Sequence, residues 1–103
     1  MTLEEQRNEF ELLCNQAKEV LLKKGNDYAT IDRLSNFKDA GKIVGITPQQ
    51  HCLALIATKV SRLGNLLQPN TTPCNEAVED SILDLFVYSA LLNMINKECI
   101  WEN

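Results

Sequence analysis

The sequence predicts an all-α fold, a compact helical bundle of three long helices and one short helix that we expect to form an oligomer. Apolar residues recur three and four positions apart, which is the helical spacing, and no segment alternates as a strand would. Residues that start and stop helices separate these apolar runs. The chain of 103 residues, 45% of them hydrophobic, fits a single domain over residues 1–103.

The first helix is expected over residues 2–24. Thr2 followed by Glu5 is a capping-box pattern, in which two side chains satisfy the free N–H groups at a helix start. The helical spacing then continues to Gly25, and glycine adopts the left-handed conformation of a helix end at the lowest cost. The following segment, 26–30, is predicted to be a turn.

The second and third helices are separated by a clear stop and start. Thr30 is a candidate cap for the short second helix, which we expect to end at Gly45. Thr47 and Pro48 are the favoured residues for the cap and the first position of a third helix, which continues to about Leu67. Brief connections of this kind place successive helices antiparallel to each other.

The fourth helix is predicted to start at Thr72 and Pro73, which repeat the same pattern, and to end near Cys99. The apolar positions of the four helices are expected to face the core. They are Phe10, Leu13, Ala17, Val20 and Leu21 in the first helix, Leu34, Phe37, Ala40 and Val44 in the second, Leu53, Ile56, Ala57, Val60, Leu63 and Leu67 in the third, and Val78, Ile82, Leu83, Phe86, Ala90, Leu91 and Met94 in the fourth.

Charge and composition exclude several classes of partner. The net charge of -4 argues against binding to a nucleic-acid duplex or an anionic membrane surface, since both rely on clustered Lys and Arg. No apolar run approaches the roughly 18 residues that span a bilayer. The acidic, polar first ten residues do not have the pattern of a signal peptide, so we expect a cytoplasmic protein.

The cysteines and the single histidine give no metal-site pattern. Cys14, Cys52, Cys74 and Cys99 are far apart, and no two form a C-x-x-C pair. We therefore expect free thiols, as is usual in a reducing compartment. His51 is predicted to lie on a helix surface.

Acidic residues follow one stripe of the fourth helix. Glu76, Asp80, Asp84 and Tyr88 are spaced four residues apart, and Glu79 lies beside them. Like charges at this spacing repel, and only the first turn benefits from the helix dipole. The two deeper aspartates therefore need another source of stabilisation.

Two basic residues of the third helix supply that source. If the two helices are antiparallel about a loop centred near residue 71, Lys59 lies opposite Asp84 and Arg62 lies opposite Asp80. These charges could form interhelical salt bridges that fix the register and stabilise the fold weakly. They could also form a site for phosphate, with or without a divalent metal, over which Lys24, Asp27 and Tyr28 fold.

Four motifs in this order resemble the phage-rich nucleotide-modification-associated domain family, which is itself distantly similar to the MazG-like all-α nucleoside triphosphate pyrophosphohydrolases. The resemblance covers the chain from Lys24 to about Leu92. The motifs are Lys24-Gly25-Asn26-Asp27-Tyr28, Asp32-Arg33-Leu34-Ser35-Asn36-Phe37, Lys59-x-x-Arg62-Leu63-x-Asn65-Leu66 and Glu79-Asp80-Ser81-x-x-Asp84-Leu85-x-x-Tyr88.

The wider resemblance implies a Mg²⁺-dependent cleavage that releases pyrophosphate. Its metal site is written E-x-x-E on one helix and E-x-x-D on the next, and here Lys59-x-x-Arg62 stands in place of the first half. This difference favours binding over hydrolysis. The expected metal ligands are Glu76, Glu79, Asp80 and Asp84, and the expected ligand-binding residues are Lys24, Asp27, Tyr28, Asn36, Lys59, Arg62 and Tyr88.

Three functions follow from these residues. The first is a nucleotide-binding protein, phage-encoded by resemblance and then acting in the host cytoplasm. The second is an active Mg²⁺-dependent nucleoside triphosphate pyrophosphohydrolase. The third is a non-catalytic phage protein that sequesters a host signalling nucleotide or inhibits a host protein. Because a chain this short rarely encloses a nucleotide alone, we expect a homo-oligomer with the site near a subunit contact.

Overall fold

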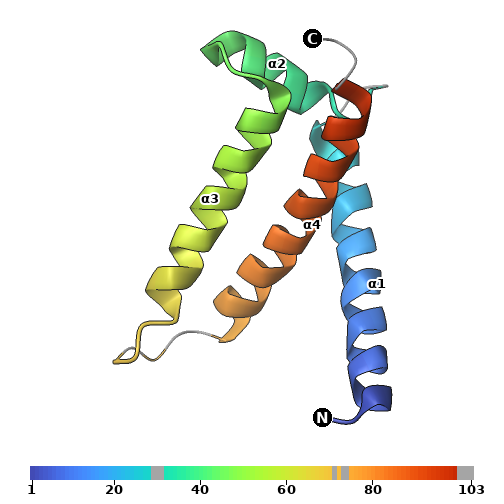
Figure 1. The fold of residues 1–103 in the computed structure, drawn as a ribbon, viewed down its shortest axis with the longest axis vertical. Coiled ribbons are helices and arrows are strands. Elements are labelled where there is room, and N and C mark those ends of the chain that lie inside the picture. Colours follow the sequence, from blue (N-terminus) through green and yellow to red (C-terminus); the bar gives the residue numbers. More distant parts are fainter. Residues whose placement is uncertain (29–31, 71, 73–74, 100–103) are drawn as a thin grey trace.

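The computed structural model is all-α, with four helices packed together, as the sequence predicts (Figure 1). It describes residues 1–28, 32–70, 72 and 75–99, and for 24–28 and 75 it describes the helical backbone alone. The helices are α1 (Leu3–Tyr28), α2 (Ser35–Val44), α3 (Pro48–Leu66) and α4 (Asn75–Cys99).

The long helices lie side by side, with α4 between α1 and α3 (Figure 1). The most extensive contact joins α3 to α4, which form an antiparallel hairpin, and α1 packs on the other side of α4. The short helix α2 packs against α3 at the end of the hairpin that is far from the 67–74 connection. None of the described helices is long and apolar enough to cross a membrane.

The start of α1 is confirmed and its end is corrected. The Thr2 hydroxyl accepts the Glu5 N–H at 3.1 Å, and the Glu5 carboxylate accepts the Thr2 N–H at 3.1 Å, which completes the capping box. The prediction that the helix stops at Gly25 is wrong, because α1 continues to Tyr28. A glycine inside a helix costs only about 1 kcal/mol relative to alanine, which neighbouring turns can offset.

The short helix α2 begins later than predicted and ends where expected. Its first residue is Ser35, and the predicted cap Thr30 lies outside the described residues. Gly45 closes the helix in the left-handed conformation, with φ of 78°. The chain then turns sharply and brings the backbone of Ile46 close to Gly41. A Cβ placed on Gly41 would lie only 2.7 Å from the carbonyl oxygen of Ile46. This close approach requires glycine at position 41.

The caps of α3 match the prediction, and α4 is described from Asn75 onward. Thr47 and Gln50 form a reciprocal capping box around Pro48 at the first turn of α3. The helix ends at Leu66, one residue before the predicted end. The first helical residue of α4 is Asn75, and the predicted Pro73 lies outside the described residues.

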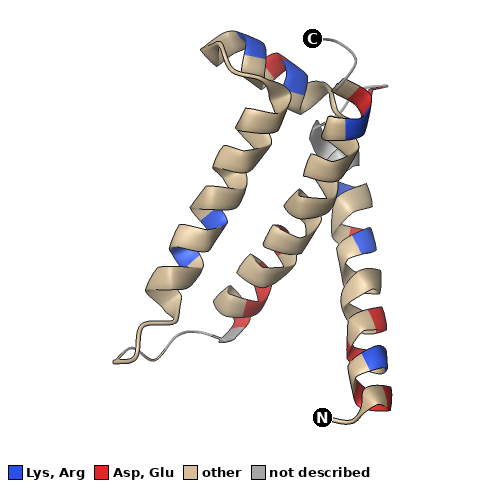
Figure 2. Cartoon of the chain, in the orientation of Figure 1, with Lys and Arg blue, Asp and Glu red and all other residues tan. Residues whose placement is uncertain are grey.

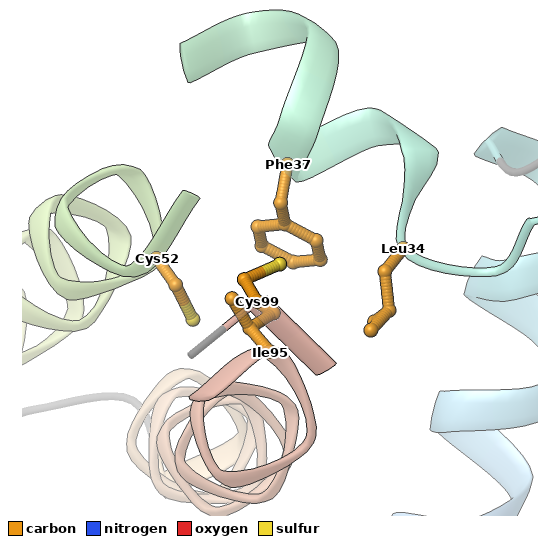
Figure 3. Packing of buried hydrophobic residues seen from close by; sticks show 5 residues of the cluster. All are labelled: Leu34, Phe37, Cys52, Ile95 and Cys99. Atoms are coloured by element: carbon orange, nitrogen blue, oxygen red, sulfur yellow. The ribbon is translucent and has the colours of Figure 1, made fainter. Parts of the chain in front are cut away.

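The main core lies where α2 meets α3 and the end of α4 (Figure 3). Phe37 from α2 points toward Cys52 of α3 and toward Ile95 and Cys99 of α4, and Leu34 closes one side. Cys52 and Ile95 are fully buried. This cluster fixes α2 across the hairpin.

A smaller contact joins α1 to α4. Ala17 of α1 and Val87 of α4 are buried, and Ser81 is buried near the start of α4. Phe10 and Phe86 meet edge to face, with ring centroids 6.4 Å apart. This contact is less extensive than the hairpin contact, so α1 is the more loosely attached long helix.

Several predicted core positions are on the surface. Residues in all four helices that the helical spacing assigned to the core are exposed, and this part of the prediction is wrong. The reason is that the long helices lie side by side, so that apolar faces remain uncovered. These positions are Phe10, Val44, Leu53, Ala57, Val60, Leu67, Ile82 and Met94.

Candidate functional site

The candidate site is centred on an ion pair between the two helices of the hairpin. Lys59 Nζ of α3 lies 2.9 Å from Asp84 Oδ2 of α4. The side chains retain only 24% and 22% of their exposure. The antiparallel arrangement and this predicted pair are therefore confirmed. Figure 2 shows the two basic positions of α3 across from the acidic first half of α4.

The second predicted pair, Arg62 with Asp80, is not formed. No ion pair joins Arg62 to Asp80 among the described residues. Arg62 is exposed, and Asp80 lines a groove between α4 and α1, on another side of α4. The step of three residues from Lys59 turns the side chain about 60° away from its position, which takes Arg62 away from the contact with α4.

Tyr88 lies one turn beyond Asp84 along α4. Its side chain is half-buried and packs against the main core. The Cys52 thiol donates to the Tyr88 carbonyl oxygen at 3.4 Å, which fixes the backbone here against α3. Tyr88 therefore lies at the edge of the core, one turn from Asp84.

The predicted metal ligands are divided between two sides of α4. Asp84 contacts Lys59, whereas Glu79 and Asp80 line the groove against α1, which has a volume of about 680 Å³. Glu76 is exposed in the first turn. Among the described residues, no three His, Cys, Asp or Glu side chains are placed to hold a metal ion together.

The remaining predicted ligand-binding residues are not brought to the ion pair by the described structure. The side chains of Lys24, Asp27 and Tyr28 lie outside the described residues. Asn36 is exposed on α2, beside the core residue Phe37. Their roles stay predictions based on the resemblance.

A second polar cluster, which sequence analysis missed, connects α2 to α4. Lys38 Nζ lies 2.7 Å from Asp32 Oδ2 and 3.5 Å from Glu98 Oε2. Asp32 Oδ1 also accepts the Leu34 N–H at 3.0 Å, just before α2 begins. This bond between residues two apart is an Asx turn, and an aspartate three residues before a helix is a local signal for it. Glu98 on α4 is distant in sequence, so no local pattern could predict its contact with Lys38.

This cluster changes the pKa values of its members. The hydrogen bond from Lys38, and then that from the Leu34 N–H, hold the pKa of Asp32 below its ordinary value. The hydrogen bond to Asp32 and the nearby charge of Glu98 raise the pKa of Lys38. The charged forms of both residues are therefore stabilised in the folded chain.

The three described cysteines are free thiols, and the histidine packs against the core. Cys52 and Cys99 are buried free thiols, Cys14 is half-buried, and Cys74 lies outside the described residues. Burial raises the pKa of the Cys52 thiol. His51 packs its ring edge to face against Phe37, with centroids 6.0 Å apart, so it is partly buried and contributes to packing.

No protein-family model, no curated protein and no solved structure matches this chain.

Proposed function

We propose that this chain binds a nucleotide or a nucleotide-derived small molecule through its phosphate, at Lys59 and Arg62. The observation that carries the proposal is the exposed Arg62 guanidinium, one turn from an anchored lysine. In the part of the chain that the structure describes, Arg62 has no hydrogen bond or ion pair. A guanidinium offers two parallel N–H donors that match phosphate oxygens.

Asp84 has a positioning role in this site. It holds Lys59 Nζ at 2.9 Å and uses one of its three N–H donors, so that the others can contact a phosphate. The partial burial of the pair strengthens its electrostatic interactions relative to open water. Asp84 thus places a positive charge at a defined point on the hairpin.

The nucleoside would lie toward Tyr88, one turn from Asp84 on the same stripe of α4. Aromatic rings bind nucleobases by stacking, and a phenol can donate a hydrogen bond to a sugar or base. Under this proposal Lys24, Asp27, Tyr28 and Asn36 remain predicted contacts, as the resemblance implies.

Binding is favoured over hydrolysis for two reasons. Lys59 and Arg62 stand where the resembled enzymes have metal-binding glutamates, and Asp84 is engaged by Lys59. The described carboxylates do not converge on one point as a Mg²⁺ site requires. The proposal therefore assigns no step to Mg²⁺, although a hydrated ion can accompany the phosphates of a nucleotide.

Isothermal titration with a panel of nucleoside monophosphates, triphosphates and cyclic nucleotides tests the proposal. Arg62→Gln should weaken binding by about tenfold to a hundredfold, because a charged hydrogen bond contributes about 1.5–3 kcal/mol. Lys42→Gln, an exposed change on α2, is the matched control and should bind as the wild type does. Failure of the wild type to bind any of these compounds would refute the proposal, as would unchanged binding by Arg62→Gln.

The same panel separates the alternative functions. Pyrophosphate release with Mg²⁺ that disappears in the Asp80→Asn, Asp84→Asn double variant would identify a pyrophosphohydrolase. Tight binding of a cyclic nucleotide without turnover would identify a sequestering protein. If no nucleotide raises the melting temperature, a helical inhibitor of a host protein becomes the better interpretation.

A further inference from the structure

The helix α3 and its C-cap residue carry an apolar stripe that points away from the core. The stripe consists of Leu53, Ala57, Val60, Gly64 and Leu67, all of which are exposed. The three large side chains are 57%, 52% and 58% exposed in this order. Their separations alternate between four and three residues, which is the spacing of helix-pairing seams.

The described chain does not cover this stripe itself. Its long helices lie side by side, with α4 in contact with both α1 and α3, and α2 packs at one end. Stable domains place two layers of secondary structure around a core, because a single layer leaves an apolar face in water. The stripe is such a face and needs a second layer.

Gly64 is an independent sign of what that layer is. A Cβ placed on Gly64 would meet no atom within 4 Å in the described structure, so no contact there requires glycine. A glycine inside a helix is destabilising relative to alanine. Glycine is useful where another backbone approaches closely, which a second helix packed on this stripe would do.

We propose that the stripe pairs with the same stripe of a second copy, with the two α3 helices antiparallel and a two-fold axis at Val60. In this arrangement Leu53 faces the partner's Leu67, and Ala57 faces the partner's Gly64. Large residues then meet at both ends of the contact, and small residues allow close approach on either side of Val60. A two-fold contact must be self-complementary, and this stripe is.

Charge and size support a second copy as the occupant. The only charged residues of α3 are Lys59 and Arg62, and neither is in the stripe, so pairing two copies brings no like charges together. The stripe is about 21 Å long at 1.5 Å per residue. An adjoining groove of about 510 Å³ reaches α4. Its lining joins Leu53 and Leu92 to polar side chains, which suit the rim of such a contact: Gln49, Gln50, Ser89, Asn93 and Asn96.

The contact and the proposed phosphate site are separate. Arg62 is two residues from Val60, which places it on nearly the opposite side of α3. Two paired hairpins would form a four-helix bundle with an Arg62 on each outer side. The dimer can therefore be tested without any nucleotide, and it can exist whether or not the proposed function is correct.

Sedimentation velocity of the full chain over a wide range of concentrations tests the dimer. The wild type should be a dimer, and Val60→Lys or Val60→Glu alone should weaken it by at least about tenfold, because like charges then meet at the axis. An equimolar mixture of the two variants should restore the dimer by pairing opposite charges. Leu12→Lys, at a position that is 52% exposed on α1, is the control and should behave as the wild type.

A second variant examines the close approach at Gly64. Gly64→Ala should weaken the dimer while leaving the helical circular-dichroism signal intact. The proposal is overturned if the wild type is monomeric at all concentrations, if Leu12→Lys and Val60→Lys dissociate alike, or if the mixture fails to reassociate. A Gly64→Ala protein that dimerises more tightly than the wild type would overturn it as well.

Discussion

Lys59 and Asp84 pair at 2.9 Å across the middle of the α3–α4 hairpin, and both side chains are about three-quarters covered. The pair joins two helices whose sequences are separated by an eight-residue connection, 67–74. It therefore reports on the register of the whole hairpin. Its partial burial makes it stronger than an ordinary surface pair. Its net contribution to stability is still small, because both side chains give up hydrogen bonds to water when they pair.

A double-mutant cycle should measure this pair directly. Lys59→Met and Asp84→Asn should each destabilise the fold, and the cycle should give a coupling free energy of about 1 kcal/mol. Urea denaturation of the wild type, the two single variants and the double variant supplies the four values. A coupling free energy indistinguishable from zero would mean that the pair does not hold the hairpin in register.

The core at the α2 end should be the most sensitive to truncation. Phe37→Ala should cost about 3–5 kcal/mol, because it removes a buried ring that packs against α3 and α4. Ile43→Ala, on the same helix at a position that is 83% exposed, should change stability by less than about 0.5 kcal/mol. Similar losses for the two variants, measured by urea denaturation, would contradict the placement of the core.

The Asp32–Lys38 pair predicts a pH dependence of stability with a definite sign. Because the folded-state pKa of Asp32 is lowered, its carboxylate stabilises the fold above the ordinary aspartate pKa of 3.8. That contribution is lost as the pH falls through the lower folded-state value. Asp32→Asn should therefore lower the melting temperature at neutral pH, and the difference from the wild type should shrink in strong acid.

The raised pKa of Lys38 acts at the other end of the pH scale. Its contribution is complete below the ordinary lysine pKa of 10.5 and disappears as the pH rises through the higher folded-state value. Asp39→Asn is a suitable control for Asp32→Asn, since Asp39 is an exposed aspartate on α2, the helix that carries Lys38. A melting-temperature difference for Asp32→Asn that persists unchanged into strong acid would argue against the pair.

The cysteines should differ in reactivity. Cys52 is fully buried with a raised pKa, so little thiolate forms near neutral pH and alkylating reagents have no access to it. Cys14 is half-buried on α1 and should react before Cys52. Peptide mapping after brief treatment with iodoacetamide measures both rates in one sample. Equal rates in the native protein would indicate that the core opens freely.

Local signals in the sequence predict the helices well. The caps at Thr2, Thr47 and Gly45 use chemistry contained within four residues, and each of these predictions is confirmed. The end of α1 was missed because Gly25 is only a mild obstacle to a helix. Helix starts and stops thus depend mainly on short stretches of chain. Gly25 is an exception, because a glycine can also be accommodated inside a helix.

The arrangement of side chains between helices was harder to predict. The Lys59–Asp84 pair follows from the loop position, but rotation about each helix axis decided that Arg62 and Asp80 do not meet. Spacing alone also assigned Leu53 and Val60 to the core, although both are exposed. A helical spacing identifies an apolar face but does not say whether the same chain or another one covers it.

The position of the main core has a mechanical consequence for the hairpin. Phe37, Cys52 and Ile95 fasten α3 and α4 at the α2 end, whereas Leu63 and Leu66, near the connecting loop, are only half-buried. The two helices of the hairpin are therefore held together more firmly at the α2 end than at the loop end. Fluctuations should therefore separate the two helices most at the loop end, and amide hydrogens near Leu66 should exchange with deuterium long before those near Ile56.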